Sequence, residues 1–375
     1  MLSFWEKKNF IQYDYIVIGA GITGLSTACC IKEKNPKASV LILERGLLPT
    51  GASTKNAGFA CIGSLSEKLA DLESMGEEKF LHLIEDRVKG LGMLRKRLGD
   101  ENMDYQKNGG FELILNRAPI EDGKMEYMNN ILKQIFNENV FHCIPKLVDV
   151  FGFNKEMVSN IVVNPIEAQI DTGKMMQTLW NYASILQIKI ITGADVLSIN
   201  EQEKSVEINV TSIQNESINF YGNKVAVCTN AFTTKFFPEL EVNPGRGQVL
   251  CTSPIADLKI KGTYSFEDGY YYFRNFEDRI IFGGGRNLDF EGETTTEFSI
   301  NHTIQQQLEF YLEEMIIPNT KYFIEQRWSG IMAFGKNKLP IIKKVSDRIA
   351  IGARLNGMGI ALGSKVADDL SNLMV

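Results

Sequence analysis

The stretch IVIGAGITG, from Ile16 to Gly24, constrains the fold of this 375-residue chain more than any other. It joins the apolar run YDYIVIG, which predicts a buried strand of a parallel sheet, to ITGLSTACCIKEKN, which predicts a helix. A second apolar run, SVLILERG, predicts another strand and ends with Glu44, 20 residues after Gly24. A strand, a glycine turn, a helix and a second strand ending in an acid form a unit that is typical of dinucleotide binding.

The three glycines of GAGITG have separate expected roles. Gly19 permits the tight turn, Gly21 lets the backbone approach a pyrophosphate, and Gly24 lets the helix pack close to the strand. The helix that begins near Ile22 and Thr23 offers unpaired N–H groups and a partial positive charge to the phosphates.

The unit alone does not separate NAD from FAD, although Glu44 would accept hydrogen bonds from a ribose in either case. The next stretch, GASTKNAGFACIG, is a polar loop directly after the second strand, where an NAD domain would normally continue to a third strand. Such a loop would bring backbone amides, Ser53 and Asn56 to the phosphates and the flavin ring. From composition alone, an ordinary turn-rich connection is equally open.

The loop GASTKNAGF resembles the GaSgrNaG loop of FAD-dependent oxidoreductases of the D-amino acid oxidase and glycine oxidase superfamily. Further segments resemble this family in the same order: NPIEAQIDTGKMMQTLWNYA, KVAVCTNAF, PGRGQVL, GYYYFRNFEDRIIFGGGR, RWSGIMAFGKNKLPII and GARLNGMGIALGSKVADDL. The resemblance implies an α/β (α+β) fold in which a Rossmann-type FAD-binding domain is interleaved with an antiparallel-sheet substrate domain. It implies an FAD-binding domain over 1–100, 145–242 and 325–375, and a substrate domain over 101–144 and 243–324.

The resemblance also implies noncovalent FAD, because the segment GIMAFGKNKLP lacks the cysteine that attaches the flavin in some relatives. The loop Asn356–Gly359, at the start of the last helix, would direct N–H groups at the N1–C2=O edge of the flavin; its alternative is a plain glycine turn. The backbone of Val196 matches a position that meets adenine, and its alternative is strand core. The expected FAD contacts are Gly19, Gly21, Ile22, Thr23, Gly24, Glu44, Arg45, Ala52, Ser53, Thr54, Asn56, Ala57, Gly58, Phe59, Val196, Thr229, Asn230, Ala231, Gly330, Asn356, Gly357, Met358, Gly359 and Ile360.

The substrate pocket is expected beside the segment GYYYFR. Alternation along a strand puts Tyr270, Tyr272 and Arg274 on one face, and Tyr271 and Phe273 on the other. Tyr270 matches the tyrosine that amino-acid-oxidising relatives place over the substrate. A packed aromatic strand is an equally open interpretation.

The arginines with which glycine oxidases clamp the substrate carboxylate are missing, since the matching positions are Met332 and Leu355. Arg286, at the end of FGGGR, falls beside the expected pocket and would supply a cation from another wall; a surface arginine is the alternative. If no arginine reaches the pocket, the expected substrate is an amine without an α-carboxylate.

The resemblance implies oxidation of the C–N bond of a small amine or amino acid, by hydride transfer to flavin N5, to an imine that water hydrolyses. Three alternatives stay open: a flavin dehydrogenase that passes electrons to an acceptor other than oxygen, a non-catalytic flavin-binding protein, and an NAD-linked dehydrogenase.

Helices in three stretches and a strand are expected between the motifs. Ser64 and Glu67 stand in capping-box spacing ahead of amphipathic helices that reach about Gly99, and GGFELILN alternates like a strand with one buried face. Residues 120–139 and 301–315 also predict helices.

Bulk properties exclude several classes of protein. The net charge of −6 argues against a nucleic-acid partner, and no apolar run is long enough to predict a membrane anchor. The start, MLSFWEKKNFIQ, does not resemble a signal peptide, and the six cysteines contain no CxxC pair, which together favour a cytoplasmic protein with reduced thiols. The three histidines lie in separate segments, so no metal site is expected.

Overall fold

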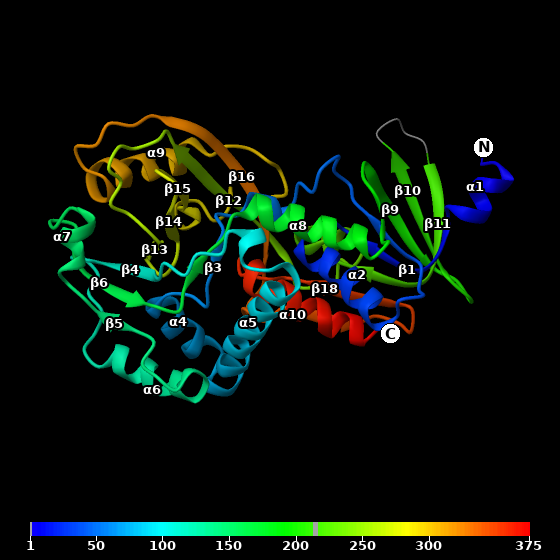
Figure 1. Cartoon of the computed structure of the whole chain (residues 1–375), viewed down its shortest axis with the longest axis horizontal. Coiled ribbons are helices and arrows are strands. Elements are labelled where there is room, and N and C mark those ends of the chain that lie inside the picture. The colour runs from blue at the N-terminus through cyan, green and yellow to red at the C-terminus, as the bar shows by residue number, and fades with distance from the viewer. Residues whose placement is uncertain (1, 213–216) are drawn as a thin grey trace.

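The computed structural model describes residues 2–212 and 217–375, which form an elongated molecule with a large sheet in each half (Figure 1). The first sheet has the strand order β17–β18–β11–β1–β2–β8, and β10 pairs with both β11 and β9. Its strands are β1 Gln12–Ile18, β2 Val40–Leu43, β8 Lys189–Ile191, β9 Ala194–Glu201, β10 Val206–Ser212, β11 Ser217–Val227, β17 Ile341–Lys344 and β18 Ile349–Ala353. The run from β18 to β8 is parallel, as the buried apolar strands predict.

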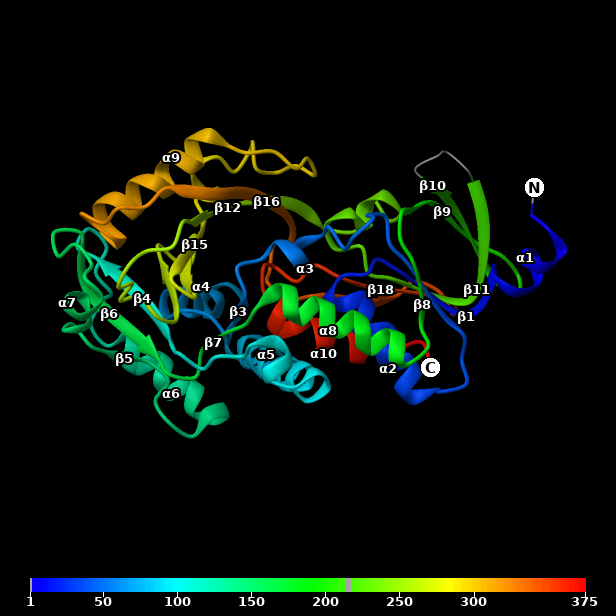
Figure 2. The ribbon, with the colours of Figure 1, turned by 45° about the horizontal axis from the view of Figure 1, so that its top comes forward.

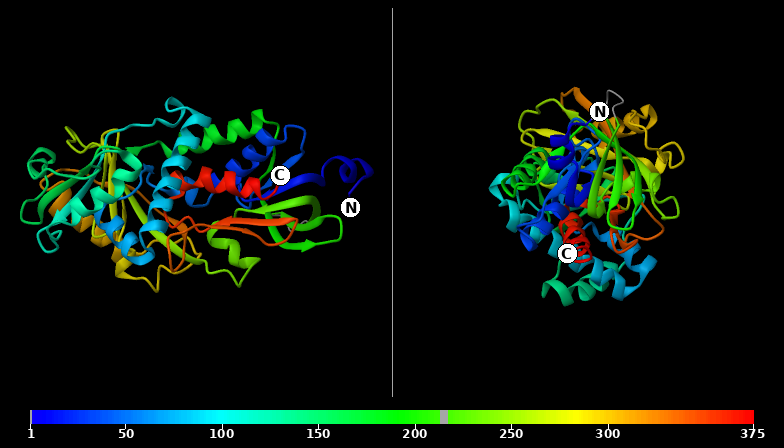
Figure 3. Two further views of the ribbon diagram at one scale, coloured as in Figure 1. Left: turned by 90° about the horizontal axis from the view of Figure 1, so that it is seen from below. Right: turned by 90° about the vertical axis from the view of Figure 1, so that its right-hand side faces the viewer.

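The first sheet is apolar on both faces because each is covered. Val17 of β1 packs into a core with the helices on one side, whereas Ile16 and Ile18 pack with β9, β10 and β11 on the other. The covering helices, α2 Ile22–Lys34, α5 Glu77–Leu98, α8 Thr172–Ile185 and α10 Gly359–Asn372, lie on the same side of the strands (Figure 3). The predicted strand, glycine turn, helix and second strand are therefore confirmed.

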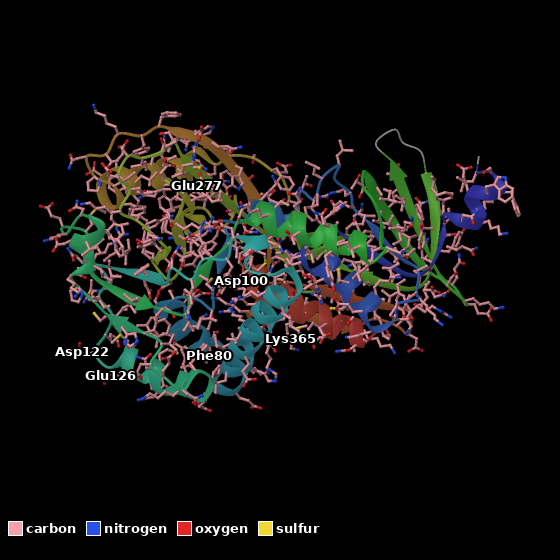
Figure 4. All side chains as sticks on the ribbon, in the orientation of Figure 1. Phe80, Asp100, Asp122, Glu126, Glu277 and Lys365 are labelled. Carbon is pink, nitrogen blue, oxygen red and sulfur yellow. The ribbon has the colours of Figure 1, made fainter. Side chains whose placement is uncertain are left out.

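Helices α5 and α10 pack closely, which joins an early segment to the last helix of the chain. A Cβ atom on Gly90 would lie 2.1 Å from the carbonyl oxygen of Ala361, so glycine lets the two backbones meet. Lys365 of α10 also lies 3.7 Å from Asp86 of α5, and Figure 4 shows Lys365 beside the α5 ribbon. Near the start of α5, Phe80 is fully buried against α4 and α6.

The second sheet has the strand order β16–β12–β15–β14–β13–β4–β6–β5 and is antiparallel except for the β13–β4 pair. Its strands are β4 Gly110–Leu115, β5 His142–Cys143, β6 Val158–Asn164, β12 Asn243–Thr252, β13 Thr263–Phe266, β14 Tyr271–Phe276, β15 Arg279–Gly284 and β16 Ile324–Phe334. The remaining elements are α1 Phe4–Asn9, α3 Ala52–Lys55, α4 Leu65–Met75, α6 Lys124–Phe136, α7 Leu147–Phe151, α9 His302–Tyr311, β3 Phe59–Ala60, β7 Ala168–Gln169 and the short turns η1 Glu101–Met103, η2 Asn230–Lys235, η3 Arg286–Leu288 and η4 Leu312–Ile316.

The two faces of the second sheet differ in chemistry. Its outer face is an aromatic core under α9, which includes Tyr264, Phe266, Tyr271, Phe273 and Phe282. Its inner face carries polar and small residues that the pairing register aligns across the strands: Gly110 and Glu112 of β4, Ser265 of β13, Tyr272 and Arg274 of β14, Gly247 of β12, and Gly330 and Met332 of β16. The predicted alternation in GYYYFR is thus confirmed. GGFELILN forms the predicted strand, but the expectation of a single buried face is wrong, because Leu113 and Leu115 pack into the aromatic core while Glu112 and Ile114 are buried on the other side.

Several predicted boundaries can now be compared with the structure. The helices expected up to Gly99 are α4 and α5, which are separated by Gly76 at φ 79°. The domain ranges remain a prediction, but the sheets divide the chain differently. Strands β6 and β16 fall within ranges assigned to the FAD-binding domain, yet both pair in the second sheet; β16 pairs with β12 from Ile324 to Phe334. None of the described helices is both long enough and apolar enough to cross a membrane.

Candidate active site

A cavity of about 760 Å³ runs between the two halves of the molecule. One end is lined by Glu44 and Val196 of the first sheet, and the other by Glu112 and Phe141 beside the second. Helix α3, from the predicted GASTKNAGF loop, lies between β16 and α8 at the junction of the two halves (Figure 2). This volume lies within the range of cofactor and ligand sites.

The glycine turn lines this cavity and has the expected geometry. Gly19 has φ 100°, which a residue with a side chain rarely adopts. A Cβ atom on Gly24 would lie 1.9 Å from the carbonyl oxygen of Gly19, so Gly24 acts through packing. Helix α2 begins at Gly21 without a side-chain cap, and its Ile22 amide donates a 2.9 Å hydrogen bond to Oγ of Ser53.

The acid at the end of β2 is held by the backbone. Glu44 is 9% exposed and accepts 2.8 Å hydrogen bonds from the amides of Ala20 and Gly46, one at each carboxylate oxygen. Each oxygen can accept a further bond, so the side chain keeps acceptor capacity toward the cavity. Close by, the guanidinium of Arg45 lies 4.1 Å from the ring centre of Phe232, and the carbonyl of Val196 accepts a hydrogen bond from Lys235.

The side chain of Asn56 holds its own loop together. Its Oδ1 accepts hydrogen bonds from the amide of Gly58 and the hydroxyl of Thr172, and its Nδ2 donates to the carbonyls of Ala52 and Ser53. The loop therefore presents backbone groups in a fixed conformation, while the asparagine amide is occupied within the protein.

The loop before the last helix lines the same cavity, and the α10 helix that follows it packs against the first turn of α2. Asn356 and Gly357 have φ of 49° and 80°, and α10 then begins at Gly359 without a side-chain cap. The sulfur of Met332 lies 3.7 Å from the Cβ position of Gly357. Two loops from opposite ends of the sequence thus converge on one cavity, each with a helix N-terminus that lacks a side-chain cap.

All but three of the residues expected to contact FAD line this cavity. The exceptions are Gly24, which packs against the glycine turn, Thr54, whose hydroxyl donates to the carbonyls of Pro49 and Gly51, and Gly58, which packs against Ile170. These three residues stabilise the conformation of the loops without lining the cavity themselves.

Two residues of the predicted pocket lie over glycines of the inner face. A Cβ atom on Gly245 would lie 2.9 Å from Cζ of Arg286, and one on Gly283 would lie 2.8 Å from the ring of Tyr272. The hydroxyl of Tyr272 is 3.8 Å from the Cβ position of Gly247 and has no hydrogen-bond partner within residues 2–212 and 217–375. Burial raises the pKa of Tyr272 to about 12, so its hydroxyl remains a donor.

Arg286 is a cavity residue and not a surface arginine. Its Cζ lies 4.4 Å from the ring centre of Phe334 and 5.4 Å from that of Phe290. Its buried Nε has no hydrogen-bond partner, and across the described chain no carboxylate lies within 4 Å of its nitrogens. Burial lowers the pKa of Arg286. Met332 and Leu355, which replace the expected arginines, also line the cavity.

The other two inner-face residues of GYYYFR have different surroundings. Tyr270 is 40% exposed at the edge of the cavity, where its ring packs edge-on against Phe290. Arg274 is buried and donates to the carbonyls of Gly58 and Ile170, so it fastens β14 to the loop after α3.

Sequence reasoning missed the acidic residues at the far end of the cavity, among them Glu112 and Glu167. A usable signal was the glutamate inside the otherwise apolar strand GFELIL, since a buried strand rarely carries a charge. The predicted capping box is half formed: the hydroxyl of Ser64 accepts from the amide of Glu67, but the Glu67 carboxylate pairs with Lys338 instead.

Known proteins share this architecture along nearly the whole chain. A probable oxidoreductase, OrdL, from Haemophilus influenzae is 22% identical over 93% of this chain and 80% of its own length. An L-proline dehydrogenase from P. horikoshii has a TM-score of 0.76 at 15% identity, covering 97% of this chain and 94% of its own. A glycine oxidase from Geobacillus kaustophilus also has a TM-score of 0.76, at 16% identity, covering 97% of this chain and 95% of its own.

The family described as FAD dependent oxidoreductase (DAO) matches residues 14–373. The site fits that cofactor, because a glycine-lined turn, an acid with spare acceptor capacity and two helix N-termini without side-chain caps face one elongated cavity. This chain therefore belongs to the DAO family of FAD-dependent oxidoreductases.

Proposed function

We propose that this protein oxidises the C–N bond of an amino acid whose carboxylate is bound by Arg286. The observation that carries the proposal is a half-buried guanidinium at the cavity wall with no carboxylate partner in the described part of the chain. Buried cations are normally paired, so a cavity cation left unpaired favours an anionic ligand group.

Comparison with another buried arginine supports this interpretation. Arg246, on the face of β12 opposite to Gly247, pairs with Glu293 at 2.7 Å and is fully occupied by protein groups. Arg286 instead lies against the rings of Phe334 and Phe290, and Nη2 donates a 3.4 Å hydrogen bond to the hydroxyl of Thr294, which leaves the guanidinium without a carboxylate in the described chain. A planar guanidinium held in this way suits a bidentate contact with a carboxylate.

Tyr272 completes the proposed carboxylate site. Its hydroxyl lies above Gly247, and the guanidinium of Arg286 lies above Gly245 on the same strand and the same face. Both donors would reach one carboxylate, while the reacting carbon lies between them and the wall formed by Gly330 and Met332. Met332 and Leu355 keep that wall apolar, which helps to exclude water.

FAD, when bound, supplies the acceptor for the hydride that leaves the carbon next to nitrogen. The protein's part is to hold the carboxylate, to orient that carbon and to keep the amine in its neutral, reactive form. The imine product would then be hydrolysed by water.

The test is anaerobic bleaching of the flavin by a panel of D- and L-amino acids, N-methyl amino acids and amines without a carboxylate. Bleaching by carboxylate substrates supports the proposal, and Arg286→Ala should weaken their apparent affinity about 100-fold. Arg117→Ala, at an exposed arginine outside the cavity, is the matched control and should have no effect.

Three results would contradict the proposal or narrow it. Unchanged affinity in Arg286→Ala would remove the carboxylate site, and bleaching by simple amines alone would point to a substrate without a carboxylate. A flavin that nothing in the panel bleaches would favour a non-catalytic flavin protein. Comparing oxygen consumption with the reduction of an artificial quinone acceptor then separates an oxidase from a dehydrogenase.

A further inference from the structure

The cavity continues beyond Tyr272 into a second compartment over the inner face of the second sheet. The pairing register aligns Tyr272 with Ser265, and Ser265 with Glu112, so these three side chains form a row across β14, β13 and β4. We use the name far compartment for the end of the cavity lined by Gly110, Glu112, Phe141, Asn164, Glu167 and Ser265.

Glu112 lines the far compartment from the inner face of the second sheet. It is 4% exposed, and its carboxylate accepts hydrogen bonds from both the amide and the hydroxyl of Ser66 at the start of α4. The hydroxyl of Ser265, its neighbour in the row, makes no hydrogen bond within residues 2–212 and 217–375.

Glu167 lies directly over Gly110, the inner-face residue of β4 two positions before Glu112. A Cβ atom on Gly110 would be 2.6 Å from Cγ of Glu167, so the strand needs glycine there to admit this side chain. Oε1 of Glu167 accepts hydrogen bonds from the amides of Ile62 and Gly63 and from Nδ2 of Asn164. Oε2 is buried at a cavity-lining residue and has no partner.

The side chains around these two glutamates include more carboxyl groups than cations. Glu112 and Glu167 are joined by Glu67, Asp71 and Asp268 of the cavity wall. The neighbouring cations are Lys68, Arg87 and Lys338, which pair with Glu67 and Asp71. Five carboxyl groups face three cations, an excess of two acids. The cations pair only with Glu67 and Asp71, so Glu112, Glu167 and Asp268 have no ion-pair partner in the described ranges.

We propose that the far compartment binds a second, cationic group of the substrate, an amino or guanidino group at the end of its side chain, through Glu112 and Glu167. This inference rests on the proposed function, because it assumes that Arg286 holds the substrate carboxylate. The preferred substrate class is then a basic amino acid, held at both ends with its reacting carbon between them.

The spacing of the site fits such a molecule. Two strand spacings, about 10 Å, separate the Tyr272 position from the Glu112 position along the row. A flexible chain of four or five atoms can cover that distance once the lengths of the two side chains are subtracted. The free Oε2 of Glu167 and the unbonded hydroxyl of Ser265 would each accept a hydrogen bond from the cation.

The experiment measures binding to the flavin-loaded protein, without turnover. 6-Aminohexanoate carries a carboxylate and a distal amine but no α-amine, and hexanoate is its counterpart without the amine. By isothermal titration calorimetry at about pH 9, above the raised pKa values of both glutamates, we expect 6-aminohexanoate to bind at least about tenfold more tightly. Glu167→Gln should reduce the ratio to about threefold or less, and Glu112→Gln should act in the same direction. Glu126→Gln, at an exposed glutamate of α6, should leave the ratio unchanged.

The outcomes separate the two proposals. Equal affinity for both ligands, or a ratio that survives Glu167→Gln, overturns the far-compartment inference even if Arg286→Ala weakens both ligands. A ratio that depends on Glu167 while Arg286→Ala changes neither affinity overturns the proposed carboxylate site and keeps the cationic subsite. No binding of either ligand overturns both. Circular dichroism and the flavin spectrum of each variant establish that it is folded and loaded.

Discussion

The hydroxyl oxygen of Ser53 accepts a 2.9 Å hydrogen bond from the backbone amide of Ile22, and it lies 2.9 Å from the position where a Cβ atom of Gly21 would stand. This contact ties the loop after the second strand to the first turn of α2. The two segments are therefore fixed relative to each other at this end of the cavity.

Replacing Ser53 with alanine should weaken FAD binding. The hydrogen bond contributes about 1 kcal/mol, so the dissociation constant for FAD should rise about fivefold. Fluorescence titration of apoprotein with FAD measures the change. Thr54→Ala is the matched control, because Thr54 does not line the cavity and its hydroxyl bonds only within its own loop, to the carbonyls of Pro49 and Gly51. Equal effects of the two substitutions would contradict a specific role for Ser53.

Gly24→Ala should damage the cofactor site although Gly24 does not line the cavity. Its Cβ atom would lie 1.9 Å from the carbonyl oxygen of Gly19, which would push α2 away from the turn. We expect a loss of stability of about 1–3 kcal/mol and protein purified with little flavin. Gly92→Ala, in the exposed middle of α5 with open space around it, should keep its flavin and gain up to about 1 kcal/mol. The flavin-to-protein absorbance ratio and thermal unfolding distinguish the two.

Tyr272→Phe should weaken carboxylate binding without changing the fold. The hydroxyl makes no hydrogen bond within the described protein, so its removal leaves no protein group unpaired. Loss of one donor to a bound carboxylate costs about 1.5 kcal/mol, or roughly tenfold in affinity for hexanoate. Calorimetric titration measures it, with an unchanged melting temperature as the control. Unaltered affinity would show that Tyr272 does not reach the carboxylate.

The buried glutamates predict a pH dependence of stability. Burial raises the pKa of Glu167 from 4.5 to about 8, and that of Glu112 to about 7. Between these folded values and the unfolded value the folded state binds more protons, so the free energy of unfolding should fall as the pH rises. Glu67 and Lys68 face Glu167 with opposite effects on its pKa.

Glu167→Gln should therefore flatten the fall in melting temperature between about pH 6 and about pH 8, because glutamine cannot ionise. Differential scanning calorimetry of the variant and the parent across this range makes the comparison. Glu126→Gln serves as the exposed control. Parallel curves for all three proteins would show that Glu167 is ionised throughout.

The sequence predicted the fold around the glycine turn well because its signals are local. The glycine turn, the two strands and Glu44 lie within one short stretch, where spacing determines geometry. The row from Tyr272 to Glu112 depends on pairing between strands that are distant in sequence, and no local pattern contains that register. The same limit applies to Arg286. The sequence left open that it is a surface residue, and only the folded structure shows it packed against the rings of Phe290 and Phe334.

Glu67 shows how a correct local pattern can still give the wrong partner for a side chain. Its spacing from Ser64 fits a capping box, and the amide half of that motif forms. The carboxylate turns instead to Lys338, which is 271 positions away and bonds to it at 2.9 Å. The Glu67 carboxylate therefore bonds to Lys338 and not to the backbone amide of Ser64, and this choice depends on a contact between segments that are distant in sequence.

The convergence of residues 19–24 with the loop 356–360 has a consequence for biosynthesis. The glycine turn is translated long before the loop 356–360, and both line one cavity. A nascent polypeptide on the ribosome can build the glycine turn early, but it cannot enclose a dinucleotide until α10 has emerged and docked. Flavin capture should thus follow the synthesis of α10, and a ribosome stalled before residue 356 should carry a chain that does not retain the flavin.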